Sequence, residues 1–162
     1  MLKRIKVTLA NGEEGEIACL ANGATAIRYR QVFHEDLLIG IGDLLKAIGT
    51  DNLKTLMKES RDDKDSEEVT PEKMNALVAI LGSGKLGMVS ELAYVMAKQA
   101  AAAENAIVDF ANRMTVEDYI KWTEQYDSMT FLTGAVEFIN LYISNKAGTS
   151  TPKKEDAQLS AR

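Results

Sequence analysis

The sequence predicts a mostly helical α+β fold, in which an N-terminal β-hairpin packs on about five helices and a disordered tail ends the chain. Apolar and polar residues alternate over residues 3–20, which is typical of half-buried strands. Apolar residues then recur every three or four positions through most of the chain, which is the period of a helix. The chain from Lys146 onward is small and polar, so it buries too little apolar surface to fold.

Length and composition favour one ordinary globular domain. The chain has 162 residues, of which 46% are hydrophobic and 27% are charged. We expect a single domain over residues 1–145, with a solvated acidic loop at 59–69, and a flexible tail over 146–162. The net charge is −5 and Lys and Arg do not cluster, so nucleic acid is not an expected partner.

Three further features of the sequence exclude other classes of protein. A single cysteine, Cys19, excludes an internal disulfide and a thiolate metal cage. A single histidine, His34, excludes a metal site with several imidazoles. No apolar run reaches the ~18–20 residues of a membrane span, and the N-terminus lacks the pattern of a secretory signal. We therefore expect a cytoplasmic protein with no membrane contact and no bound metal or cofactor.

The predicted hairpin is placed by its turn. Ile5, Val7 and Leu9 alternate with polar residues, and Asn11–Gly12 is a strong tight-turn signal. A second run at 16–20 pairs back on the first. Because a lone hairpin is only marginally stable in water, its apolar face is expected to lie against the helices.

A long helical pattern follows a break at Asn22–Gly23. Thr25 is suited to cap this helix, and Gly49 is suited to end it. Gly40 and Gly42 weaken its middle, where we expect a kink or a break. The predicted apolar face consists of Ile27, Phe33, Leu37, Ile41, Leu44, Leu45 and Ile48.

The middle of the chain predicts a short helix at 51–59, the acidic loop, and two further helices. Thr70–Pro71 combines a capping hydroxyl with a proline suited to the first helical position. The next helix would bury Met74, Leu77, Val78 and Leu81, and Gly82–Gly87 would end it. An alanine-rich helix is then expected over 88–110, with an apolar face that includes Val89, Leu92, Val95, Met96 and Ile107.

Two helices are predicted near the C-terminus. Thr115 and Asp118 have the spacing of a capping box, which starts the first of them. The second is expected to run from about 128 to 145. Together they carry most of the aromatic residues, which favour a core, with a partner-binding groove as the alternative: Tyr119, Trp122, Tyr126, Phe131, Phe138 and Tyr142.

The candidates for catalysis are weak. Gly82–Lys85 suggests a phosphate loop, but the chain has Ala79 where the motif needs a glycine and Leu86 where it needs Ser or Thr. His34 is expected at the surface and Cys19 in the core. We find no catalytic constellation and predict that the protein is not an enzyme.

Several segments together resemble a known family. The most telling element is Arg-Tyr-Arg-x-x-Phe-x-x-Asp-Leu at 28–37, and it is followed by the helices Glu91–Lys98 and Met114–Trp122 and by the tail segment 149–154. Over about residues 3–155 the chain resembles the tail assembly chaperones of long-tailed (siphovirus-type) bacteriophages and prophages, especially those of Gram-positive hosts.

The resemblance implies a function without catalysis. Such chaperones bind the long helical tape-measure protein, keep it soluble and promote polymerisation of the tail tube around it. They work in the cytoplasm of the infected or lysogenic host and are absent from the mature virion. A frameshifted, longer form would recruit the tail-tube protein, and the mobile tail is suited to carry that extension.

Two helices are the predicted partner-binding surface. The residues are Tyr29, Phe33, Leu37, Tyr119, Trp122 and Tyr126. The alternative is that these side chains pack the two helices against each other. An exposed hairpin edge would also offer a site for formation of a homo-oligomer.

Other functions stay open at this point. The main alternative is a structural or adaptor component of a phage particle, such as a connector or a scaffold-like helical protein. A nucleotide-dependent enzyme rests only on the loop at 82–87.

Overall fold

The fold is mostly helical and begins with a two-stranded antiparallel hairpin, which confirms the predicted α+β class. The computed structural model describes residues 2–54, 70–105 and 114–147. Seven helices lie wholly within these residues, and residues 50–54 are helical where the short helix was expected. The number exceeds about five because two of the predicted helices are each divided. The predicted acidic loop at 59–69 lies outside the described residues, as does the predicted tail beyond residue 147.

The hairpin consists of β1 (Leu2–Thr8) and β2 (Glu14–Leu20). The predicted turn is present: Gly12 has φ +86°, and its N–H donates to the carbonyl of Leu9 at 2.9 Å. Glycine adopts this backbone conformation without steric cost. The alternation buries one face of the hairpin, which carries Ile5, Val7, Ile17 and Cys19.

The first predicted helix is divided into α1 (Thr25–Phe33) and α2 (Leu37–Ile48). His34 ends α1 in the left-handed conformation, with φ +58°. The Asp36 carboxylate then caps α2 by accepting hydrogen bonds from two backbone N–H groups, at 2.9 and 3.2 Å. An aspartate in this position satisfies donors that the helix itself leaves free, so it fixes the start of α2.

The predicted kink at Gly40 and Gly42 is wrong, because α2 runs unbroken through both residues. Gly40 is buried against Met88, and a β-carbon at this position would overlap the Met88 sulfur. Close packing thus offsets a propensity cost of about 1 kcal/mol for glycine. Gly49 ends α2 as predicted, with φ +84° and its N–H on the carbonyl of Leu45.

Thr25 does not cap α1, contrary to the prediction, since it is the first residue of the helix and follows the N-cap residue Ala24. Its hydroxyl accepts a hydrogen bond from the Asn22 N–H and donates one to Gln99 Oε1 at 2.8 Å. Gln99 Nε2 in turn donates to Asn22 Oδ1 at 2.8 Å. This buried network ties the start of α1 to α5 (Leu86–Asn105).

The helix α4 (Pro71–Ser83) begins as predicted, with the Thr70 hydroxyl accepting a hydrogen bond from the Lys73 N–H. It ends at Gly84, which has φ +69°. The helix α5 follows at an angle of 99° to α4. The predicted apolar face of α5 is buried at Val89, Leu92, Val95 and Met96, and Ile107 lies outside the described residues.

The C-terminal part contains α6 (Val116–Thr123), α7 (Thr130–Thr133) and α8 (Ala135–Ala147). The last two replace the single helix that was predicted over 128–145. The division at Gly134 is slight, because its N–H and its carbonyl still take part in helical hydrogen bonds at 2.9 and 3.1 Å.

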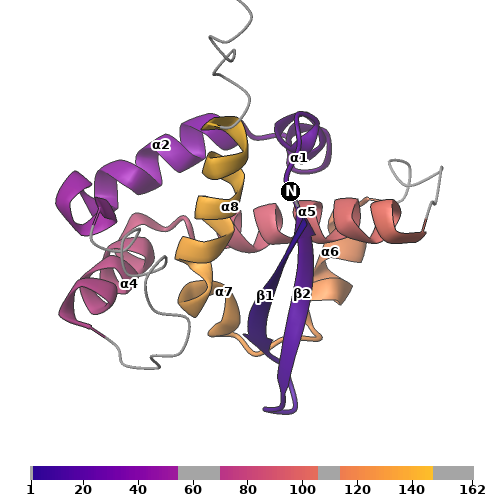
Figure 1. The fold of residues 1–162 in the computed structure, drawn as a ribbon, viewed down its shortest axis with the longest axis horizontal. Coiled ribbons are helices and arrows are strands. Elements are labelled where there is room, and N and C mark those ends of the chain that lie inside the picture. The colour runs from indigo at the N-terminus through magenta and orange to yellow at the C-terminus, as the bar shows by residue number, and fades with distance from the viewer. Residues whose placement is uncertain (1, 55–69, 106–113, 148–162) are drawn as a thin grey trace, which may run out of the picture.

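The long helix α5 crosses the middle of the fold and packs against β2, α1, α6, α7 and α8 (Figure 1). The hairpin is fixed at its turn end, where the Thr130 hydroxyl donates to the Thr8 carbonyl and accepts from the Thr8 N–H, at 2.8 and 3.1 Å. Among the described helices, none is by itself both long and apolar enough to cross a membrane, although the bent pair α4–α5 meets the criteria jointly.

Candidate partner-binding surface

Three of the six residues predicted to bind a partner are buried. The exposed fractions are 0% for Tyr29, 1% for Leu37 and 9% for Trp122. The prediction that these side chains form an exposed surface is therefore wrong. They follow the helical period because they belong to the core, which is the more frequent reason for such a pattern.

The remaining three residues are half-buried and belong to a chain of aromatic rings. The ring of Phe33 on α1 lies 5.1 Å from that of Tyr119 on α6, and Trp122 lies 4.9 Å from Tyr126. Tyr94 on α5 joins the two pairs, with its ring 5.5 Å from Tyr119 and 5.6 Å from Trp122. The alternative that these residues pack the two helices against each other is thus what the structure shows. Edge-to-face pairs of this kind contribute about 0.5–1.5 kcal/mol beyond their buried area.

The hydroxyl groups of this cluster are held by polar partners on neighbouring helices. Tyr29 donates to a carboxylate oxygen of Glu91 at 2.5 Å, and the oxygens of Tyr119 and Ser90 are also 2.5 Å apart. Burial raises the pKa of Glu91, although the hydrogen bond from Tyr29 opposes this shift. Burial also raises the pKa of Tyr29, and so does its bond to Glu91.

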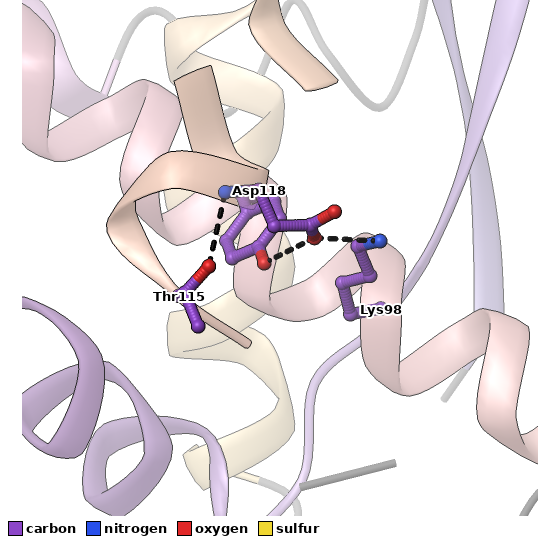
Figure 2. Close-up of polar contacts among 4 residues, drawn as sticks. Lys98, Thr115 and Asp118 are labelled. Atoms are coloured by element: carbon purple, nitrogen blue, oxygen red, sulfur yellow. Dashed lines mark hydrogen bonds and ion pairs between the residues drawn. The ribbon is translucent and has the colours of Figure 1, made fainter. Parts of the chain in front are cut away.

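A third link ties α6 to α5 through Asp118. Its carboxylate accepts a hydrogen bond from the Tyr94 hydroxyl at 2.6 Å and lies 2.9 Å from Lys98 Nζ. Figure 2 shows this carboxylate turned toward Lys98, while the Asp118 N–H donates to the Thr115 hydroxyl. These contacts fix the orientation of α6 and therefore the positions of its rings.

Two of the predicted residues, Tyr119 and Tyr126, line an open groove of about 420 Å³. Leu86 and Ser90 at the start of α5 and Phe131 on α7 complete its walls. The acidic residues Glu124 and Asp127 also line it, as do Thr123 and Ser128. The sequence pattern identified the two tyrosines but offered no reason to connect them with the start of α5, which is about thirty residues away.

A second surface lies on α4, where the prediction of the buried face is wrong. The side chains of Met74, Val78 and Leu81 are 50%, 61% and 54% exposed. Ala76 and Ile80, on the opposite face of the helix, are buried instead. The exposed residues have the spacing i, i+4 and i+7, so they form one stripe along the helix. We call these three residues the α4 stripe.

The sequence feature that indicated this exposed face is that α4 carries apolar residues on both of its faces. A helix that is apolar all round is normally covered on all sides. Within the described residues, packing buries Ala76 and Ile80 and partly covers Ala79 and Leu77. Leu77 is thus the one member of the predicted face that packs against the core. The helix α2, which packs on α4, adds two further exposed apolar side chains, Leu38 at 52% and Ile39 at 65%. Three consecutive apolar residues, such as those at 37–39, cannot all face the core in a helix, because successive side chains point in different directions. The sequence therefore already indicated that some of them are exposed.

Cys19 and His34 lie where the sequence predicted them, in the core and at the surface. Cys19 is buried in β2, and burial raises the pKa of its thiol to about 12. His34 is exposed at the end of α1. Gly82 and Ser83 are the last residues of α4, and Gly84 and Lys85 connect it to α5, whereas a phosphate loop follows a strand. The described part of the chain contains no group of three His, Cys, Asp or Glu residues placed to hold a metal ion.

Comparisons of the chain with protein-family models, with curated proteins and with solved structures found no match.

Proposed function

We propose that this protein is a tail assembly chaperone of a long-tailed bacteriophage or prophage, which binds the tape-measure protein and promotes tail-tube polymerisation around it. The observation that carries the proposal is the α4 stripe, in which Met74, Val78 and Leu81 leave one side of an apolar helix uncovered. The role is one of binding and masking, without catalysis.

The α4 stripe has the form of a surface that pairs with another helix. Anchors at i, i+4 and i+7 are the pattern by which amphipathic helices dock through their apolar faces. The stripe spans seven residues, which corresponds to about 10 Å along the helix axis. A long helical partner with a matching apolar stripe would cover these side chains and would have its own apolar surface masked in return.

The stripe is also placed on a stable support. The helix α4 is capped at its start by Thr70 and packs on α2 through its other face. A surface that is already formed before binding loses little conformational entropy when the partner docks. Clustered apolar side chains on such a surface are more typical of interaction sites than of bare protein surface.

The test is co-expression with the tape-measure protein encoded in the same genome. We expect the partner to precipitate when it is expressed alone and to remain soluble and co-purify in the presence of this chain. The variant Met74→Ser/Val78→Ser/Leu81→Ser should reduce the co-purified partner by about tenfold or more, because removal of each apolar side chain from the interface weakens binding by roughly 1 kcal/mol.

A matched control is available on the same chain. Ile27, Val116 and Ile120 are exposed to a similar extent on α1 and α6, so their triple serine variant makes the same chemical change elsewhere. We expect this control to retain the partner. Equal reduction of the co-purified partner by both variants would contradict a role for the α4 stripe. Recovery of this chain in purified virions, together with no effect on partner solubility, would contradict the chaperone function and favour a structural component.

A further inference from the structure

The groove between α5, α6 and α7 combines an aromatic wall with an acidic rim. Tyr119, Tyr126 and Phe131 are the aromatic residues of its lining, and Glu124 and Asp127 are the acidic ones. The groove is open to solvent and has a volume of about 420 Å³, which is enough for a long side chain.

The aromatic wall is fixed before any ligand enters. The Tyr119 hydroxyl is held at 2.5 Å from Ser90 Oγ. The Tyr126 ring packs at 4.9 Å from Trp122 and at 5.9 Å from Phe131. Tyr119 and Tyr126 are half-buried, whereas Phe131 is only 7% exposed and packs against Tyr126. Rings that are held in place before binding contact a ligand at little entropic cost.

The acidic residues of the groove have no cationic partner among the described residues. Asp127 is positioned by the Met129 N–H, which donates to Oδ2 at 2.8 Å, and this leaves Oδ1 for a ligand. Glu124 is exposed at the end of α6. Neither carboxyl group forms an ion pair within the described residues, and the described lining includes no Lys or Arg.

The nearby cations have other positions or partners. Lys121 lies 3.5 Å from Glu117, and Lys98 lies 2.9 Å from Asp118. Lys85 comes directly before Leu86 in the sequence but does not line the groove. The groove therefore presents two negative charges beside aromatic rings, which is complementary to one cationic side chain with an aliphatic stem.

We propose that this groove receives an arginine side chain of the protein partner. This proposal rests on the proposed function, because the partner is the protein that the α4 stripe binds. The aliphatic stem would lie along Leu86 and Phe131, as long cationic side chains do on apolar surfaces. The planar guanidinium would stack on the ring of Tyr119 or Tyr126 and donate to Glu124 and Asp127. The groove would thus add a charge requirement to the apolar contact that the α4 stripe makes with the same partner.

The test is a titration of the ¹⁵N-labelled full chain with n-butylguanidinium, followed by amide chemical shifts. We expect saturable shifts at Gly87, Ser90, Thr123 and Ser128, with a Kd on the order of 10 mM for a probe of about eight non-hydrogen atoms. The neutral analogue n-butylurea has the same shape, and we expect it to bind about fivefold more weakly or not at all. Absence of saturable shifts, or equal binding of the two probes, would overturn the proposal.

Variants keep the test specific. Glu124→Gln/Asp127→Asn removes both charges but retains an oxygen that can accept from the Met129 N–H, so the fold should be preserved. This variant should weaken n-butylguanidinium binding about fivefold, whereas Glu117→Gln/Glu137→Gln, with the same change in charge outside the groove, should leave it unchanged. Equal effects of both variants would show a general charge effect and overturn the proposal. Failure of the wild-type chain to solubilise the tape-measure protein would instead contradict the proposed function and leave the probe titration unaffected.

Discussion

Asp118 has two structural roles: one at the start of its own helix, and one in contacts with another helix. The sequence pairs it with Thr115 as a capping box, and its N–H does donate to the Thr115 hydroxyl at 3.0 Å. Its carboxylate, however, faces away from the helix start and contacts Tyr94 and Lys98 on α5 (Figure 2). A spacing rule detects the backbone contact, but it has no means of detecting partners from another helix.

The stability that Asp118 contributes should depend on pH. Burial by itself raises the pKa of Asp118, but the hydrogen bonds from Lys98 and Tyr94 outweigh burial and lower the pKa below its ordinary value of 3.8. A carboxyl group with a lowered pKa in the folded state stabilises the fold above its unfolded pKa, and this stability is lost as the pH falls through the folded pKa.

We therefore expect Asp118→Asn to lower the free energy of unfolding at about pH 7 by about 0.5–1 kcal/mol, since the side chain is partly exposed. The difference from the wild type should narrow as the pH falls below 3.8. Urea unfolding of both proteins at a series of pH values measures this difference in the free energy of unfolding. The control is Glu117→Gln, whose exposed pair with Lys121 should contribute almost nothing. A difference in the free energy of unfolding that does not change with pH would contradict the link between the ionisation of Asp118 and stability.

At the scale of the elements, the division between α1 and α2 is decided by caps rather than by glycine content. The helix α2 contains two glycines and does not break, whereas the chain breaks just before it at His34 and Asp36. A cap satisfies several backbone groups at once, which outweighs the modest propensity cost of a glycine. The two glycines of α2 also differ, because Gly40 contacts Met88 while a β-carbon at Gly42 would meet open space.

This difference predicts opposite outcomes for two alanine substitutions. Gly42→Ala should stabilise the protein by about 0.5–1 kcal/mol, through a lower entropy of the unfolded chain and a better helix propensity. Gly40→Ala should be neutral or destabilising, because the Met88 side chain must move to make room. Thermal unfolding of the two variants provides the comparison. Equal stabilisation by both would show that Met88 moves without cost.

At the scale of the whole molecule, the aromatic chain joins elements from both ends of the sequence. The rings run from α1 through α5 and α6 to α7 and α8, with Trp122 in the middle. Its ring lies within 5.6 Å of those of Tyr94, Tyr126 and Phe131. A residue with this many neighbours stabilises the common core rather than one helix.

Trp122→Ala tests this role. The truncation should cost about 3–5 kcal/mol, which corresponds to a fall in Tm of roughly 10 °C for a chain of this size. We expect calorimetry to show one cooperative transition at the lower temperature, because the cluster connects most of the described helices. An unchanged Tm would instead assign Trp122 to a surface, in line with the sequence-based prediction. Val116→Ala on the exposed side of α6 serves as the control and should leave Tm within about 2 °C.

Much of the fold could be predicted from local sequence. The hairpin follows from the alternation and from Asn11–Gly12, and the starts of α4 and α6 follow from Thr70 and Thr115. These features depend on residues within four positions of each other, so their physics is contained in a short window of sequence. The same holds for Cys19, whose place on the apolar face of a strand indicated burial.

The candidate site could be predicted only in part. Tyr119 and Tyr126 were identified, but Ser90, Glu124 and Asp127 were not, because the groove is assembled from three helices. The face of α4 that remains uncovered could not be read from the chain either, since Met74, Val78 and Leu81 are as apolar as a core requires.

The sequence by itself thus determined the class of the fold, the hairpin and the helix caps at Gly49, Thr70 and Thr115, because these depend on backbone hydrogen bonding and on the period of the side chains. Only the tertiary structure decided that Tyr29, Leu37 and Trp122 are core and that the α4 stripe is surface. Periodicity shows that a helix has an apolar face, but burial depends on which other elements cover that face. That choice is made by contacts between residues far apart in the chain, such as those that α5 forms with the hairpin and with six other described helices.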